Sequence, residues 1–121
     1  EILQTIIDTR ESGAKVGLSI KPKTPIEALF PYFPYIDLAL LMSVEPGKGG
    51  QAFIESSYDR MKALKEHKEK GGFHDVILEI DGGINDITGP RALSSGADLL
   101  VAGSYLFGHD DFAERMKKIL E

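Results

Sequence analysis

Four short apolar runs alternate with segments that have helical spacing, and this alternation is the strongest constraint on the fold. The runs cover residues 16–20, 36–44, 76–80 and 99–102. The second run, IDLALLMSV, is apolar almost throughout, which is typical of a strand covered on both faces. Strands that alternate with helices form a parallel sheet with right-handed crossovers. The sequence therefore predicts an α/β fold.

Capping residues mark the helices near the start of the chain. Apolar residues one turn apart predict a helix over residues 1–12, with Gly13 at its C-terminal cap. Thr24 is expected to cap a second helix, with Pro25 in its first turn and Glu27 completing the capping box. Two further prolines should keep this helix short.

Three later helices are predicted in the same way. The first ends at Gly71-Gly72, and the second runs to about Ser95 with Gly96 after it. Apolar positions spaced i, i+4, i+7 and i+8 predict a buried face on the last one. The three are expected to begin at Ser56 or Ser57, at Asn85 or Asp86, and near Asp110.

Length and composition bound the class of protein. With 121 residues the chain has room for one domain, 1–121, and the absence of cysteine removes disulfides, thiol catalysis and cysteine metal sites. A net charge of −5 argues against nucleic-acid binding. No apolar run is long enough to span a membrane, and no signal peptide is visible, so we expect a cytoplasmic protein.

Glycine pairs, one of them a Gly-Ser pair, follow three of the predicted strands. They are Gly49-Gly50, Gly82-Gly83 and Gly103-Ser104. Ligands bind at the carboxyl ends of strands in parallel α/β folds, and glycine lets backbone N–H groups approach an anion. Any single pair is explained equally well by a tight turn. Three pairs at one edge favour a phosphate site, and barrel enzymes place it after the last two strands.

Asp81 stands at the tip of the third strand. A carboxylate there can exchange a proton, bind a metal or cap the next helix, and spacing alone leaves these roles open. His67, His74 and His109 lack the spacing of metal ligands. His67 lies among Lys and Glu residues, so we expect it to be solvated. Met42, near the tip of the second strand, is expected to fill the core.

Four segments together resemble the ribulose-phosphate 3-epimerases. Residues 15–22 (KVGLSIKP) are similar to the fifth strand of that family. Residues 41–53 (LMSVEPGKGGQAF) resemble the signature of the sixth strand, and residues 79–85 (EIDGGIN) that of the seventh. Residues 96–104 (GADLLVAGS) are similar to the eighth. The segments occur in the order and spacing of the family over nearly the whole chain.

The resemblance implies a (β/α)8 TIM barrel, of which this chain is the second half, strands five to eight. It also implies interconversion of D-ribulose 5-phosphate and D-xylulose 5-phosphate. One carboxylate of the family removes the C3 proton to give a cis-enediolate, and a second, on the opposite face, reprotonates C3. A divalent metal, usually zinc but also iron, manganese or cobalt, stabilises the enediolate oxygens.

The resemblance assigns roles to individual residues. Asp81 matches the seventh-strand aspartate, which is both metal ligand and acid/base, and Met42 matches a methionine that lines the enediolate site. The positions that match the mobile loop over the substrate are Gly47, Lys48, Gly49 and Gly50. Those that match the phosphate site are Gly82, Gly83, Gly103 and Ser104. The family usually has an aromatic residue where this chain has Lys48, which puts the packing of the loop in doubt.

The first half of the family's barrel has no counterpart in these residues. That half carries the second catalytic aspartate, two histidine ligands and a further carboxylate ligand. Because no cap precedes Glu1, we expect a piece of a chain of roughly 200 residues or more, which is inactive alone and forms a homo-oligomer when complete. The alternatives are an epimerase of a six-carbon substrate such as D-allulose 6-phosphate, and a non-catalytic half barrel that binds phosphate.

Overall fold

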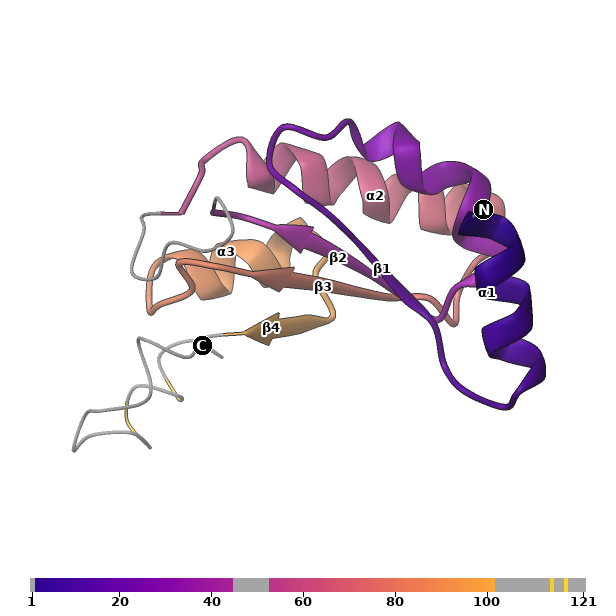
Figure 1. Ribbon diagram of the computed structural model, residues 1–121. Coiled ribbons are helices and arrows are strands. Elements are labelled where there is room, and N and C mark those ends of the chain that lie inside the picture. Colours follow the sequence, from indigo (N-terminus) through magenta and orange to yellow (C-terminus); the bar gives the residue numbers. More distant parts are fainter. Residues whose placement is uncertain (1, 45–52, 102–113, 115–116, 118–121) are drawn as a thin grey trace.

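The computed structural model describes residues 2–44, 53–101, 114 and 117. Strands and helices alternate along the chain, as the sequence predicts (Figure 1). The strands are β1 (Gly17–Ile20), β2 (Leu38–Met42), β3 (Ile77–Asp81) and β4 (Leu99–Val101). The helices are α1 (Ile2–Glu11), the 3-10 helix η1 (Ile26–Tyr35), α2 (Ser57–Gly71) and α3 (Thr88–Ser95).

The four strands form one parallel sheet in the order β1-β2-β3-β4. The register places Ser19 beside Leu40 and Leu40 beside Glu79. All four strands therefore end at the same edge of the sheet, which we call the carboxyl edge. The predicted α/β fold with a parallel sheet is confirmed.

The two faces of the sheet differ because side chains alternate along each strand. Leu41, Leu78 and Ile80 point to the helical side and are fully buried, together with Met61 and Leu64 of α2. Helices α2 and α3 contact each other on this side of the sheet (Figure 1). This face and the helices on it form the hydrophobic core.

The opposite face, here called the open face, carries the alternate residues of every strand. Leu38, Leu40 and Met42 of β2 are half-buried there. Ile77 and Leu99 are each 44% exposed, although both are large and apolar. Apolar side chains in the middle of a parallel sheet are normally covered on both sides. The open face is thus the surface that the described residues leave without a covering layer.

The helix after β1 differs from the prediction. Pro25, not Thr24, occupies the N-cap position and makes no side-chain capping bond, so the predicted capping box is wrong. The helix is η1, a 3-10 helix, and it runs through Pro31 and Pro34 instead of ending before them. Proline cannot donate to the carbonyl four residues back, and its ring clashes with that carbonyl, so a regular α-helix does not continue through Pro31 and Pro34.

The predicted glycine C-caps are present, whereas the predicted N-cap of α3 is not: the structure has Ile87, rather than Asn85 or Asp86, at that position. Gly13 has φ +93° and its N–H donates to the carbonyl of Arg10. Gly72 has φ +72° and ends α2, which Ser56 precedes as N-cap without a bond from its hydroxyl. Helix α3 begins at Thr88, later than predicted, yet Oδ1 of Asn85 accepts the N–H groups at its start, at 2.8 and 2.9 Å.

The predicted last helix lies mostly outside the described residues. Glu114 and Lys117 fall within it, and both have helical backbone and exposed side chains. Among the described helices, none combines the length and the apolar character that crossing a membrane requires.

Candidate functional site

Asp81 is the last residue of β3 and lies at the carboxyl edge. It stands beside Met42 in the register of β2 and beside Val101 in that of β4. By the alternation of side chains, Asp81, Met42 and Glu79 share the open face. Asp81 and Met42 are half-buried. The structure thus brings together two residues that the sequence singled out separately.

Gly82 and Gly83 make the turn that follows Asp81, and both require glycine. Their φ angles are +118° and +70°. A Cβ atom on Gly82 would lie 2.6 Å from Cγ2 of Val44, and one on Gly83 would lie 2.7 Å from the backbone N of Phe53. Real Cβ atoms do not approach other atoms so closely. The backbone therefore packs tightly here, as a close approach to a ligand would also demand.

The turn is held by side chains at the start of α3. Oγ1 of Thr88 donates to the carbonyl of Gly83 at 2.7 Å and accepts the N–H of Asn85 at 2.9 Å. Asn85, rather than Asp81, provides the capping oxygen for α3. The geometry therefore does not favour Asp81 as the cap of α3. Proton exchange and metal binding remain as the possible roles of its carboxylate.

Ser43 is a site residue to which the sequence analysis assigned no role. It is fully buried, and its hydroxyl lies 2.9 Å from the carbonyl oxygen of Asp81 and 2.5 Å from that of Gly82. Its N–H also donates to Asp81, and its own carbonyl accepts the N–H of Ile54 at 2.8 Å. In the sequence, Ser43 is marked only as the single hydroxyl residue near the end of the apolar run 36–44.

Glu79 is the second carboxylate on this part of the open face. Burial raises the pKa of Glu79, and the negative charge of Asp81 two residues along the strand raises it further. Two acidic groups near each other favour a shared proton or a bound cation. The carboxyl edge is therefore acidic where β3 ends.

A divalent metal needs more ligands than the described residues supply. Catalytic zinc sites take three protein ligands, commonly His, Cys, Asp or Glu. Within the part of the chain that the structure describes, no three such residues are gathered at one place. Asp81 offers one carboxylate. The metal that the resemblance implies does not fit these residues alone.

The other predicted site residues lie outside the described ranges. They are Gly47, Lys48, Gly49 and Gly50 of the loop after β2, and Gly103 and Ser104 after β4. Of the predicted site, the structure describes Met42, Asp81, Gly82 and Gly83.

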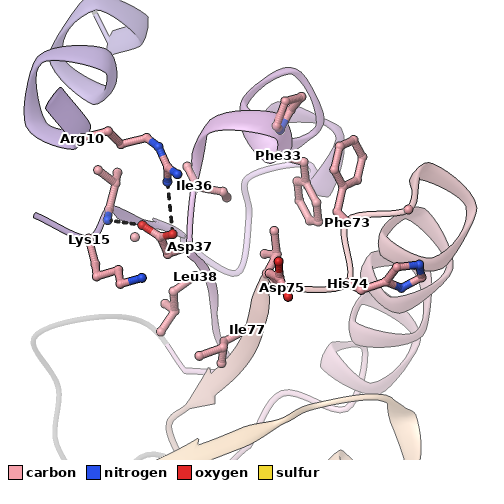
Figure 2. A pocket seen from close by; sticks show the side chains of 15 residues that line it. Arg10, Lys15, Phe33, Ile36, Asp37, Leu38, Phe73, His74, Asp75 and Ile77 are labelled. Atoms are coloured by element: carbon pink, nitrogen blue, oxygen red, sulfur yellow. Dashed lines mark hydrogen bonds and ion pairs between the residues drawn. The ribbon is translucent and has the colours of Figure 1, made fainter. Parts of the chain in front are cut away.

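A cavity of about 890 Å³ lies at the opposite edge of the sheet, where the strands begin. Figure 2 shows the side chain of Arg10 pointing toward Asp37, with an Nη1–Oδ1 distance of 3.1 Å. The other oxygen of Asp37 accepts the N–H of Val16 at 2.8 Å. The charges of Arg10 and Asp37 are therefore satisfied within the fold. Ligands of parallel sheets bind at the carboxyl ends, which favours the edge of Asp81 instead.

The prediction that His67 is solvated is wrong. Its ring stacks on Phe30 with centroids 3.8 Å apart and meets Phe33 edge-on at 4.8 Å. Its Nε2 atom is buried without a hydrogen-bond partner among the described residues. The neighbours of His67 in the sequence are charged, but its side chain packs against Phe30 and Phe33 of η1. His67 is thus part of an aromatic cluster rather than of the site.

Comparison with known proteins identifies the family to which the chain is similar. A profile described as the ribulose-phosphate 3 epimerase family matches residues 1–107. The ribulose-phosphate 3-epimerase of Bacillus subtilis (strain 168) is 40% identical over 116 residues, which are 96% of this chain and 54% of that protein. That of Escherichia coli (strain K12) is 38% identical over 112 residues, 93% of this chain and 48% of that protein.

A plant protein extends the range of relatives. The chloroplastic ribulose-5-phosphate-3-epimerase of Arabidopsis thaliana is 39% identical over 116 residues, which are 96% of this chain and 41% of that protein. The chain spans about half the length of the curated relatives that it matches.

Proposed function

Because the chain belongs to the ribulose-phosphate 3-epimerase family, we propose that the complete protein interconverts D-ribulose 5-phosphate and D-xylulose 5-phosphate. The family has a TIM-barrel fold, and we assign residues 1–121 to the second half of that one domain, strands five to eight. The observation that carries the proposal is the carboxylate of Asp81 at the carboxyl edge. It stands beside Met42 and is followed directly by Gly82 and Gly83.

Asp81 is the acid/base group of the proposed reaction on one face of the substrate. Its carboxylate takes the proton from C3, which leaves a cis-enediolate, and returns a proton in the reverse direction. A general base of this kind must lie within hydrogen-bond reach of the carbon acid in a site that excludes water. Inversion at C3 needs a second carboxylate on the opposite face of the substrate. We assign that group to the first half of the barrel.

The turn after Asp81 is proposed to bind the phosphate. Gly82 and Gly83 have no side chains to block their N–H groups, and α3 begins five residues after Gly83. Backbone N–H groups near a helix N-terminus stabilise an anion without any lysine. We place the rest of the phosphate site at Gly103 and Ser104. The loop with Gly47, Lys48, Gly49 and Gly50 is proposed to cover the substrate.

A divalent metal is part of the proposal, with Asp81 as one ligand. Zinc is the metal that we favour over iron, manganese or cobalt, and its remaining ligands would come from the first half of the barrel. The metal, when bound, would stabilise negative charge on the oxygens of the enediolate. Metal analysis of the complete protein tests this point separately from the assay of activity.

The 121-residue chain is proposed to be inactive by itself. It supplies one of the two carboxylates, and its open face exposes Ile77 and Leu99, which the first half of a barrel would cover. Incubation with D-ribulose 5-phosphate in D₂O tests this directly. We expect no deuterium at C3 with this chain alone, and its incorporation would contradict the proposal.

The deciding experiment compares two substrates with the complete protein. We expect turnover of D-ribulose 5-phosphate to exceed that of D-allulose 6-phosphate by at least about tenfold, since one extra carbon in a fitted pocket is worth about that much. The reverse preference would identify a six-carbon epimerase. Heat of binding for both compounds without turnover would identify a non-catalytic phosphate-binding protein.

A further inference from the structure

Ser43 connects the end of β2 with the turn that follows β3. Ser43 is fully buried, and its N–H, hydroxyl and carbonyl all take part in hydrogen bonds: the first two with the turn after β3, the carbonyl with Ile54. A serine hydroxyl donates one hydrogen, which the carbonyl groups of Asp81 and Gly82 share, and the carbonyl of Asp81 also accepts the backbone N–H of Ser43. Ser43 thus forms hydrogen bonds with the carbonyl groups of two successive peptide units.

The planarity of the peptide bond carries this effect to the other side of the turn. In a trans peptide the C=O and the N–H of the same group point in opposite directions. The carbonyls of Asp81 and Gly82 point toward Ser43. The N–H groups of Gly82 and Gly83 belong to these same two peptides, so they point away from Ser43. These are the two N–H groups that the proposed function assigns to the phosphate.

The positive φ of Gly82 is a reason why hydrogen bonds to this turn matter. At +118° the residue lies outside the regions that most residues occupy, and glycine leaves the chain free to choose among several conformations. The hydroxyl of Ser43 restricts this choice at the carbonyl of Gly82, and Thr88 does so at the carbonyl of Gly83. The same serine holds Ile54 through its carbonyl, and the neighbouring Phe53 packs against Gly83.

We propose that Ser43 is a positioning residue. It fixes the N–H groups of Gly82 and Gly83 for the substrate phosphate, and it fixes the backbone from which the carboxylate of Asp81 projects. This inference rests on the proposed function for the identity of the substrate. The orientation of the turn and its affinity for phosphate are measurable without turnover.

The test uses Ser43→Ala and Ser43→Cys in the complete protein. Alanine removes the donor, whereas cysteine keeps a similar volume with a weaker donor. The matched control is Ser95→Ala, because Ser95 is also buried and its hydroxyl also donates to a backbone carbonyl, that of Arg91 at 2.8 Å. The readouts are calorimetric affinity for inorganic phosphate, the amide resonances of Gly82 and Gly83, and kcat and KM.

We expect Ser43→Ala to weaken phosphate binding about tenfold, the value of one well-placed hydrogen bond. It should shift the amide resonances of Gly82 and Gly83, raise KM and lower kcat. The phosphate affinity of Ser43→Cys should lie between those of Ser43→Ala and wild type. If Ser43→Ala does not fold, the comparison of Ser43→Cys with wild type is the test. Ser95→Ala should bind phosphate within about twofold of wild type even if its melting temperature falls.

Two outcomes overturn the inference. One is phosphate affinity of both Ser43 variants within about twofold of wild type, with unchanged amide resonances. The other is a wild-type protein that does not bind inorganic phosphate at all. A wild type that binds phosphate but does not epimerise either substrate would contradict the proposed function. In that case, weaker phosphate binding by Ser43→Ala would still support the positioning role.

Discussion

Oδ2 of Asp98 accepts a hydrogen bond of 3.0 Å from the backbone N–H of Leu78 on the neighbouring strand β3. Oδ2 of Asp37 does the same for Val16, which precedes β1, at 2.8 Å. Each aspartate directly precedes its own strand, β4 or β2. The same interaction, from an aspartate carboxylate to a backbone N–H, therefore joins the beginnings of β1 and β2 and the beginnings of β3 and β4.

These carboxylates should make the stability of the protein depend on pH in the acid range. The N–H of Val16 and then Arg10 lower the pKa of Asp37, against the effect of burial. Burial raises the pKa of Asp98, but the N–H of Leu78 and the charge of Lys68 together outweigh it and lower the pKa. A lowered pKa in the folded state gives stability that is present above pH 4 or so and is lost as the pH falls through the folded value.

We expect Asp98→Asn to reduce the free energy of unfolding at pH 7 by about 1 kcal/mol, because it weakens a charge-assisted hydrogen bond. The difference from wild type should shrink below about pH 4, where both side chains are neutral. Urea unfolding from pH 3 to 7 measures both effects. The exposed Asp86→Asn is the control and should match wild type throughout. A constant difference at all pH values would speak against the linkage.

Gly72 and Gly83 have nearly equal φ angles but different surroundings, so alanine variants of the two distinguish the cost of backbone strain from the cost of steric overlap. Gly72 has φ +72° and no atom within 4 Å of the place that a Cβ would take, whereas at Gly83, with φ +70°, a backbone N lies 2.7 Å from that place. Gly72→Ala should cost about 1 kcal/mol, the effect of the left-handed conformation alone. Gly83→Ala should cost at least about 2 kcal/mol more, since the backbone must shift. Thermal unfolding of both variants tests this, and equal costs would contradict it.

Asp81→Asn should abolish epimerisation by the complete protein and leave the affinity for inorganic phosphate within about threefold of wild type. Asparagine has nearly the same shape but cannot take up the proton from C3, and loss of a general base costs about 10² to 10⁴ in rate. Turnover and calorimetry measure the two effects. Asp86→Asn is again the control. Near-normal turnover by Asp81→Asn would show that Asp81 is not the acid/base group of the reaction.

His67→Phe should stabilise the protein. The Nε2 atom of His67 is buried without a partner among the described residues, and its ring already stacks on Phe30. Replacing an unsatisfied polar ring by an apolar one of similar shape removes the cost of desolvation, about 1 kcal/mol. The exposed His74→Phe is the matched control and should give no gain. A lower melting temperature for His67→Phe would mean that the nitrogen has a partner.

Much of the fold follows from the sequence because the strongest signals were local. The apolar runs predicted all four strands to within two residues at each end, and Gly13 follows α1 with a positive φ as expected. The helix after β1 could not be predicted correctly from a capping pattern. Its winding reflects Pro31 and Pro34, which a regular α-helix does not accommodate, and a capping pattern at Thr24 carries no information about these later positions.

The site was only partly predictable for a similar reason. Asp81 and the glycine pair after it stand out because a charged residue and two glycines interrupt an apolar run. Ser43 does not stand out, since its role depends on contacts with a strand 38 residues further along the chain. His67 was misjudged because charged neighbours in sequence say little about which side of a helix faces η1. Long-range contacts of this kind appear only once the elements are placed.

The strand order of the sheet has a consequence for how the chain acquires its structure during synthesis. Among the described residues, each strand pairs with the strands immediately before and after it in the sequence. As the chain leaves the ribosome, β2, β3 and β4 each follow a partner strand that has already been synthesised, and each of these pairings closes a loop of one strand-helix unit. Contacts of short sequence separation favour rapid folding. The pairings from β1 to β4 can therefore form in the order in which these strands are synthesised.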